Sequence, residues 1–270
     1  MADWIAPLRR VPVRIAADQI LFLDMRDAVC RDILRDSPYD HHPWEPDEQQ
    51  VMRRIVRRGE IAFDIGAHFG EHSVLLADLV GPHGRVFAFE PNPERLDALR
   101  RTVTQRGNGQ VLPFAVADAP GTALLYVPEY HVAASLADWT QNRVGRVQTI
   151  PCERISLDAL IANGAVPQPD FVKCDVEGAE LLVFRGAVRM LDRPDAPIVM
   201  YEANLPGARA FGFSIAASTE FLAQLRAPGY SFFWIQPQGT LRPVRELQPG
   251  VELFNLVAVP ASKRERVTVC

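Results

Sequence analysis

The sequence predicts an α/β protein with a doubly wound, mostly parallel seven-stranded sheet, an antiparallel C-terminal hairpin and an N-terminal helical extension. The first observation is that short apolar runs alternate with helical patterns from residue 60 onward, which implies parallel strands joined by right-handed crossovers. The second is that the early runs are almost continuously apolar, as expected for strands covered by helices on both faces. The third is that no helical pattern separates the last two runs, 230–236 and 251–259, which we therefore expect to pair antiparallel.

Length and composition fit one main domain over residues 46–270 preceded by an extension over residues 1–45. The chain has 270 residues, 48% of them hydrophobic, which is enough for a buried core. The net charge of −4 favours neither nucleic acid nor a membrane surface as a partner. The four cysteines lack the C-x-x-C spacing of a zinc site, and we find neither a signal peptide nor a membrane-spanning run. These features predict a cytoplasmic protein.

The extension has an irregular pattern, in which residues 15–34 fit one helix or two short helical pieces. It is a candidate for a lid over a cleft or for part of a homodimer interface. Residues 47–58 have a helical pattern, with acidic residues in the first turn and an apolar face that Met52 and Ile55 share.

The alternation of strands and helices then continues to the end of the chain. Asn92 followed by Pro93 is typical of a helix cap and first turn. We expect strands at residues 61–65, 85–90, 110–116, 170–175, 196–203, 230–236 and 251–259. We expect helices at residues 70–80, 93–105, 156–163, 177–191 and 217–226.

Two further short strands, at 122–127 and 147–152, interrupt this alternation and flank a loop over residues 128–143. A loop of this length inside a compact domain is more often functional than not. The loop is therefore a candidate substrate lid, and ordinary surface cover is the alternative. Its aromatic and imidazole side chains include Tyr130, His131 and Trp139.

The most informative segment runs from Asp64 to Gly70, where an apolar strand ends, a glycine turn follows and a helix begins. Such a turn lets the backbone approach a ligand closely, and the helix N-terminus offers free N–H groups. Dinucleotide-binding folds place a glycine where this chain has His68. Asp64 would repel a pyrophosphate, whereas it would attract an amino or sulfonium cation.

Each of the first five main strands is followed by a carboxylate. Any one of these acids fits a helix N-cap equally well, but packing does not explain the set, because buried unpaired carboxylates are costly. Glu90 follows Gly66 by 24 residues, about the distance at which an acid reaches ribose hydroxyls. The set predicts a cationic, hydroxyl-rich ligand, and S-adenosylmethionine has these properties. Its members are Asp64, Glu90, Asp118, Asp175 with Glu177, and Glu202.

Four blocks resemble the FkbM family of class I S-adenosylmethionine-dependent methyltransferases. They are residues 63–70, 86–92, 155–160 and 170–180, of which the last is the most family-specific. The similarity spans roughly residues 58–204. It implies a Rossmann-like fold, S-adenosylmethionine as cofactor, and O-methylation of a hydroxyl on a small molecule, such as a sugar, a glycan or a polyketide-type natural product.

The resemblance also implies roles for single residues. Asp64, Gly66 and Gly70 would line the methionine side, and Glu90 would hold the ribose. Ala117 and Asp118 would lie near the adenine. The family often has Asn at the position of His68, for which a turn-capping role and a catalytic role both stay open. The candidate cofactor-binding residues are Asp64, Gly66, His68, Gly70, Glu90, Pro91, Asn92, Ala117, Asp118 and Asp175.

Methyl transfer to an alcohol needs alignment of the reactants and a general base within hydrogen-bond reach. By resemblance, the end of the fourth strand faces the methyl donor, which favours Asp175 and Glu177; His68 and Glu202 are further candidates. Two carboxylates this close could alternatively hold a divalent metal, which we do not favour. Lys173 points to the same face of the strand as Asp175, and we expect it to pair with a carboxylate and to be structural.

Other functions stay open at this stage. Within the same class, the chain could be an N-methyltransferase or a protein methyltransferase. From other classes, the alternatives are a nicotinamide-dependent oxidoreductase and a non-catalytic nucleoside-binding protein. The missing central glycine and the lack of a Tyr-x-x-x-Lys pair speak against the oxidoreductase.

Overall fold

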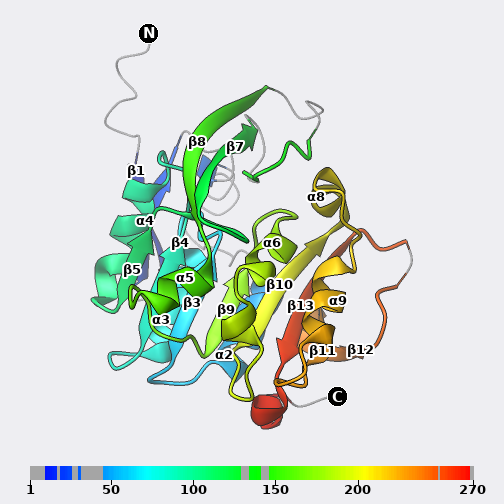
Figure 1. Ribbon diagram of the computed structural model, residues 1–270. Coiled ribbons are helices and arrows are strands. Elements are labelled where there is room, and N and C mark those ends of the chain that lie inside the picture. Colours follow the sequence, from blue (N-terminus) through cyan, green and yellow to red (C-terminus); the bar gives the residue numbers. More distant parts are fainter. Residues whose placement is uncertain are drawn as a thin grey trace.

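The computed structural model describes residues 10–16, 19–25, 30–31, 45–128, 134–140, 146–248 and 250–267. Its centre is an eight-stranded sheet of order β12-β11-β13-β10-β9-β3-β4-β5 (Figure 1). The five strands from β5 to β10 in this order are parallel, so the predicted α/β fold with a mostly parallel sheet is confirmed. The strands are β3 (Ile61–Ile65), β4 (Arg85–Phe89), β5 (Gly109–Leu112), β9 (Phe171–Cys174), β10 (Ile198–Asn204), β11 (Ser231–Gln236), β12 (Thr240–Val244) and β13 (Leu253–Val259).

The C-terminal part of the sheet carries one strand more than the sequence predicts. β11 and β13 pair antiparallel as expected, and β13 also pairs antiparallel with β10. The additional strand, β12, lies at the edge of the sheet and pairs with β11. The sequence hides β12 because Pro243 lies within it, and proline in a strand is tolerated mainly at a sheet edge.

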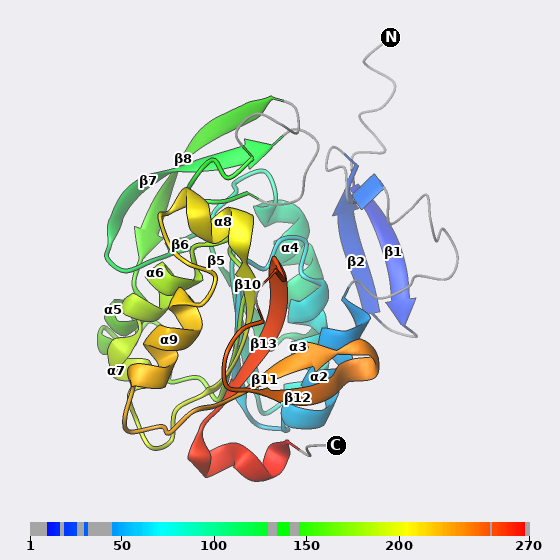
Figure 2. The same ribbon diagram turned by 90° about the vertical axis from the view of Figure 1, so that its right-hand side faces the viewer.

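Helices cover both faces of the sheet, as Figure 2 shows. One face packs against α2 (Pro46–Ile55), α3 (Glu71–Val80) and α4 (Leu96–Val103), and the other against α5 (Leu157–Ala162), α6 (Glu180–Arg185), α7 (Val188–Leu191) and α9 (Ala217–Gln224). Each face has its own apolar core, built around Phe63 and Phe184 on one side and Met52 and Leu76 on the other. Further helices with described bounds are α8 (Leu205–Ala210) and the short 3₁₀ segments η2 (Thr104–Arg106), η3 (Pro237–Gly239) and η4 (Ala261–Arg266).

The segment 177–191, expected as one helix, is divided into α6 and α7. Gly186 lies between the two helices, and its α-carbon approaches the backbone of Ala117 so closely that an added Cβ would be 2.0 Å from that carbonyl oxygen. This close contact ties the helix pair to the carboxyl end of β6 (Ala115–Val116).

Within the N-terminal extension, residues 10–24 contain a β-hairpin where the sequence pattern suggests helix from residue 15, whereas Cys30 and Arg31 are helical. β1 (Arg10–Ala16) pairs antiparallel with β2 (Gln19–Asp24). The alternation of buried Val13, Leu21 and Leu23 with more exposed neighbours is the period of a strand. The backbone N–H of Phe22 donates to Thr102 Oγ1 of α4 at 3.1 Å, and Figure 2 shows the hairpin beside this helix. Apart from Met25, Cys30, Arg31 and Glu45, the rest of the predicted extension lies outside the described residues.

The two short strands predicted between residues 121 and 152 are confirmed. β7 (Gly121–Pro128) and β8 (Val147–Ile155) pair antiparallel, and β6 joins them in a three-stranded sheet of order β6-β8-β7. This small sheet lies at the same end of the molecule as α8, which follows β10 (Figure 1). Its position places the described part of the loop between β7 and β8, residues 134–140, near the carboxyl ends of the parallel strands.

Candidate active site

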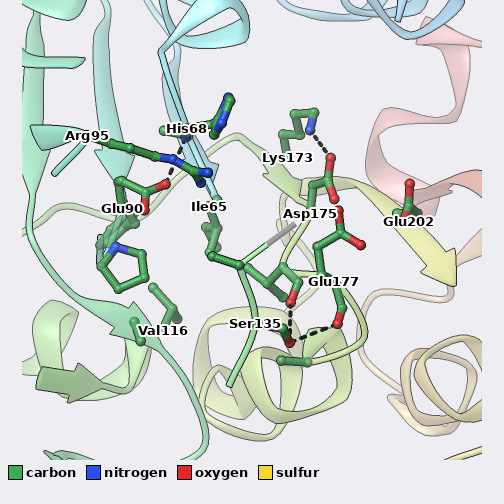
Figure 3. Close-up of a pocket in the computed structure, with 18 of the residues that line it drawn as sticks. Ile65, His68, Glu90, Arg95, Val116, Ser135, Lys173, Asp175, Glu177 and Glu202 are labelled. Carbon is green, nitrogen blue, oxygen red and sulfur yellow. Dashed lines mark hydrogen bonds and ion pairs between the residues drawn. The ribbon is translucent and has the colours of Figure 1, made fainter. Parts of the chain in front are cut away.

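A pocket lies at the carboxyl ends of β3, β4, β9 and β10, where doubly wound sheets bind their ligands. Its volume is about 320 Å³, within the range of small-molecule sites. Figure 3 shows Glu90 on one side of the pocket and Asp175, Glu177 and Glu202 on the other. We call the first side, formed by Gly66, His68, Glu90 and Pro91, the turn side. The acidic side is formed by Glu45, Asp175, Glu177 and Glu202.

The turn after β3 is shaped by residues with positive φ angles. Gly66 has φ +85°, and a Cβ there would lie 1.8 Å from the backbone oxygen of Asp175, so no other residue fits without movement of the backbone. His68 has φ +52°, a conformation in which non-glycine residues are uncommon. Gly66 and His68 both line the pocket as predicted. Gly70 does not: it precedes α3, and a Cβ there would meet Leu99 of α4.

Glu90 is held by backbone donors from two turns. Its side chain is 3% exposed, Oε2 accepts from the N–H of His68 at 3.0 Å, and Oε1 accepts from the N–H of Asn92 at 2.8 Å. The carboxylate is therefore fixed at the edge of the pocket. Pro91 lines the pocket, whereas Asn92 stabilises the turn, because its Oδ1 accepts from the N–H of Glu94 at 3.0 Å.

The far end of the turn side differs from the prediction. Ala117 is fully buried and Asp118 pairs with Arg154 at 3.5 Å, and neither residue lines the pocket. The residues just before them in the chain line it, together with one residue of β7. This apolar group comprises Phe114, Ala115, Val116 and Leu125. The predicted strand 110–116 does end at the pocket. It is broken into β5 and β6, however, and residues 114–116 line the pocket in place of Ala117 and Asp118.

Asp64 lies behind the pocket and not in its lining. The carboxylate is 1% exposed and accepts a hydrogen bond from Ser73 Oγ, while its Oδ1 has no hydrogen-bond partner among the described residues. Burial raises the pKa of Asp64, and the positive charge of Lys173 and the hydrogen bond from Ser73 oppose this rise. Asp64 and Lys173 are register partners on β3 and β9, so the acid acts on the site through the lysine.

Lys173 is the buried cation beneath the acidic side. Its Nζ donates to Asp175 Oδ2 at 2.8 Å and lies 3.8 Å from Glu45 Oε2 (Figure 3 shows the first contact). Burial lowers the pKa of Lys173, but the carboxylates of Asp175, Glu45 and Asp64 outweigh burial and raise it above its ordinary value. The expected pairing of Lys173 with a carboxylate is confirmed, and the lysine stays charged.

The acidic side holds more carboxyl groups than this one lysine can pair with as charged carboxylates, and their pKa values are raised accordingly. Burial, together with the charges of Asp175 and Glu180, raises the pKa of Glu177 to about 8. Burial and the same neighbours raise the pKa of Glu202 to about 10. Asn204 Nδ2 donates to Glu177 Oε2 and to Glu202 Oε1, both at 3.1 Å, and so holds the two carboxyl groups together.

Glu45 and His72 complete this side, and sequence reasoning did not place Glu45 in the site. Glu45 directly precedes α2, and burial raises its pKa to about 8. His72 is on the first turn of α3, with its Nε2 3.5 Å from Glu45 Oε2. Burial and the charge of Lys173 hold the pKa of His72 well below its usual value. No local motif marks Glu45, because it reaches the pocket only through the packing of α2 on the sheet.

The loop between β7 and β8 covers the pocket where it is described. Ser135, Leu136 and Trp139 line the pocket, which agrees with the predicted lid, whereas Tyr130 and His131 lie outside the described residues. Ser135 Oγ donates to the backbone oxygen of Glu177 at 2.9 Å, and its backbone pairs with Tyr126 of β7. The loop is thereby tied to the acidic side. Arg95, at the start of α4, also lines the pocket and was not predicted.

Cys152 and Cys174 are free and buried, and Cys30 is buried as well. None of the helices in the described ranges is long and apolar enough to cross a membrane.

Comparison with known proteins gives one family. Residues 64–232 match the methyltransferase FkbM domain. The hexuronic acid methyltransferase AglP of Haloferax volcanii is 30% identical over 161 residues, which cover 58% of this chain and 64% of that protein. The protein-L-isoaspartate O-methyltransferase of Aeropyrum pernix is 34% identical over 79 residues, 29% of this chain and 30% of that protein. The chain therefore spans less than two thirds of the length of either relative.

Solved structures are similar at lower identity. A SAM-dependent O-methyltransferase from Thermotoga maritima has 13% identity and a TM-score of 0.45, with 93% of this chain and 78% of that chain covered. A methyltransferase from Streptococcus mutans, described as putative and in complex with SAH, has 11% identity and a TM-score of 0.45, with 81% and 100% covered.

Proposed function

Because the chain belongs to the FkbM methyltransferase family, we propose that it transfers a methyl group from S-adenosylmethionine to a hydroxyl of a small molecule such as a sugar, a glycan or a polyketide-type product. The observation that carries the proposal is the opposition, in one pocket, of a fixed carboxylate at Glu90 and a group of carboxyl side chains around Asp175. A ligand with hydroxyls at one end and positive charge at the other fits this arrangement.

The residues of the turn side suit the nucleoside part of the cofactor. Glu90 keeps both oxygens in place through backbone N–H donors, so it accepts hydrogen bonds from ribose hydroxyls without reordering. The apolar group of Phe114, Ala115, Val116 and Leu125 suits the adenine ring. The close contact of Gly66 with Asp175 brings the two sides together, so one ligand can touch both.

The acidic side suits the sulfonium and the acceptor. S-adenosylmethionine, when bound, supplies a methyl group on a positively charged sulfur. Among the four candidate bases, we place proton removal from the acceptor hydroxyl at the Asp175–Glu177 pair. Asp175 is engaged by the Lys173 ammonium, which leaves Glu177 to take the proton. Glu202 assists through the shared Asn204 contact, and His68 orients Glu90 through its backbone N–H.

The acceptor class rests on the family and on the composition of the lid. AglP of Haloferax volcanii is named as a hexuronic acid methyltransferase, and a sugar acceptor of this chain would agree with that relative. Trp139 and Ser135 line the pocket, and aromatic and hydroxyl side chains are well suited to sugar rings. We propose that the chain acts in the cytoplasm, in the biosynthesis of a methylated small molecule.

Cofactor binding tests this proposal most directly. At about 100 times its Kd, S-adenosylhomocysteine should raise the melting temperature by roughly 5–10 °C, whereas NAD and NADP should not change it. Incubation with S-adenosylmethionine and candidate sugars, hexuronic acids among them, should then give a methylated product, with the methyl on oxygen by NMR. A melting temperature that rises with NAD and does not rise with S-adenosylhomocysteine would overturn the proposal.

A further inference from the structure

We propose that Asn204 is a positioning residue, whose side-chain amide holds the Glu177 carboxyl group where it can take the proton of the acceptor hydroxyl. This inference rests on the proposed function, in which Glu177 is the base. Asn204 is the last residue of β10, is 9% exposed and does not line the pocket, whereas Glu177 and Glu202 both line it. Asn204 therefore acts on the reaction only through these two neighbours.

The two ends of the Asn204 side chain have different partners. Its Oδ1 accepts from the backbone N–H of Gly207 at 3.1 Å and so caps α8. An N–H needs an acceptor, so this cap sets which end of the amide is the oxygen. The Nδ2 group then points the other way, where it donates to Glu177 Oε2 and to Glu202 Oε1, both at 3.1 Å. A flipped amide would set oxygen against carboxylate oxygen, so the orientation is fixed.

The backbone that carries Glu177 is held by other neighbours. Glu177 has φ +55°, a conformation that is uncommon for a residue other than glycine. Ser135 Oγ donates to its carbonyl oxygen at 2.9 Å, a contact that Figure 3 shows. A Cβ on Gly178 would lie 2.1 Å from the backbone carbon of Gly207, so the segment also packs directly on the start of α8. With the backbone fixed in this way, the hydrogen bond from Asn204 sets the direction of the carboxyl group.

Donation from an uncharged amide also suits the chemistry of a base. A group that takes the acceptor proton must start as a carboxylate, and a hydrogen bond to the carboxylate favours this charged form. Burial and the neighbouring carboxylates oppose it by raising the pKa values of Glu177 and Glu202, whereas the hydrogen bond from Asn204 lowers that of Glu202. The charged groups that act on the two acids from β9, from α6 and from the residue before α2 are Lys173, Asp175, Glu180 and Glu45.

Two substitutions in the full chain separate the cap from the positioning role. Asn204→Ser keeps an oxygen for the cap but lacks the amide donors, whereas Asn204→Ala lacks both. With S-adenosylmethionine and the candidate sugar that the parent methylates, both variants should lose about tenfold to a hundredfold in kcat, because misplacement by about 1 Å can cost a hundredfold. The KM for S-adenosylmethionine should stay within about twofold, since Asn204 does not line the pocket. Only Asn204→Ala should lower the melting temperature.

Asn163→Ser is the matched control. The Asn163 Oδ1 also accepts a backbone N–H, that of Ala165 at 3.0 Å, but this residue is exposed and lies outside the pocket. The control should keep the kcat of the parent. A kcat that falls equally in Asn163→Ser and Asn204→Ser would overturn the proposal, because the loss would then not depend on the contact with Glu177.

Carbon-13 NMR titration of the glutamate carboxyl groups gives a readout that needs no acceptor. Glu177→Gln assigns the signal of the base. The titration midpoint of Glu177 should rise in Asn204→Ser, which loses the donor, and should rise further in Asn204→Asp, which adds a carboxylate. The pH at which kcat reaches half of its maximum should rise in the same order, because the base must be deprotonated. A role limited to capping α8 would move neither value.

The proposal is overturned if Asn204→Ser keeps the kcat of the parent, or if the midpoint of Glu177 is the same in the parent and in both variants. Binding of S-adenosylhomocysteine is measured in parallel on the parent and the variants. If all of them bind it and the variants keep the parent's kcat, the positioning role falls and the proposed methyltransferase stands. If the parent itself does not bind it, the proposed methyltransferase falls, and the role of Asn204 falls with it.

Discussion

The two sides of the pocket use carboxylates in opposite ways. On the turn side, Glu90 is a single acid whose oxygens accept two backbone hydrogen bonds, so its position is set by the turns around it. On the acidic side, several carboxyl groups crowd around Lys173, and burial and mutual repulsion raise the pKa values of Glu45, Glu177 and Glu202. The comparison teaches that an acid fixed by backbone donors suits binding, whereas crowded acids are suited to exchange protons or to hold a cation.

The largest effect is expected where the two sides touch. Gly66→Ala would place a Cβ 1.8 Å from the backbone oxygen of Asp175, at a φ of +85°. We expect a loss of unfolding free energy of about 3–5 kcal/mol, from the left-handed conformation and the overpacking together. Urea denaturation measures the loss.

Gly59→Ala is the matched control for this substitution. Gly59 has the same φ of +85°, but nothing lies within 4 Å of an added Cβ. It should therefore lose only about 1–2 kcal/mol, the cost of the backbone conformation. Equal losses in the two variants would show that the contact between the two sides does not contribute to stability.

The second-largest effect is expected for the pH dependence of stability, to which the buried acid Glu180 contributes. Burial raises the pKa of Glu180 to about 7, against hydrogen bonds from the N–H groups of Val176 and Gly178 that lower it. The folded protein keeps this proton up to about pH 7, whereas the unfolded chain loses it near pH 4.5. The folded state binds more protons in between, so stability falls as pH rises from about 4.5 to about 7.

The substitution Glu180→Gln should abolish this loss of stability with rising pH. At about 1.4 kcal/mol per pKa unit, the variant should gain roughly 3 kcal/mol over the parent at pH 8 and almost nothing at pH 4.5. Melting curves across this range check it, with Glu220→Gln as an exposed control that should change little at any pH. A gain of the same size at pH 4.5 and pH 8 would mean that the proton on Glu180 does not account for the difference.

The smallest effect is expected for ligand binding on the turn side. Glu90→Ala should weaken the binding of S-adenosylhomocysteine by roughly 1–3 kcal/mol, the scale for losing hydrogen bonds to a charged group. Isothermal calorimetry measures the affinity, and Glu94→Ala, an exposed acid on the same turn, should leave it unchanged. Unchanged affinity in Glu90→Ala would show that Glu90 does not bind the ribose.

Much of the turn side followed from the sequence because its signals are local. A strand, a glycine turn and a helix start within about ten residues placed Gly66 and His68, and the distance to Glu90 placed the acid on the next strand. Such local units fold in the same way wherever they occur in a parallel sheet. The same local signals also predict ligand contacts for Asn92, Gly70 and Asp64. In the structure, Asn92 stabilises the turn, Gly70 packs against α4, and Asp64 belongs to the buried charge network.

The amino-acid sequence by itself determined the α/β fold, the family and the acids at the strand ends, because alternating patterns and short motifs are written in neighbouring residues. Only the tertiary structure decided which side chains meet. Glu45 and His72 join Asp175 through the packing of α2 and α3 on the sheet, and Ser135 reaches Glu177 from a separate small sheet. These contacts depend on distances between elements far apart in the chain, and no local pattern records such distances.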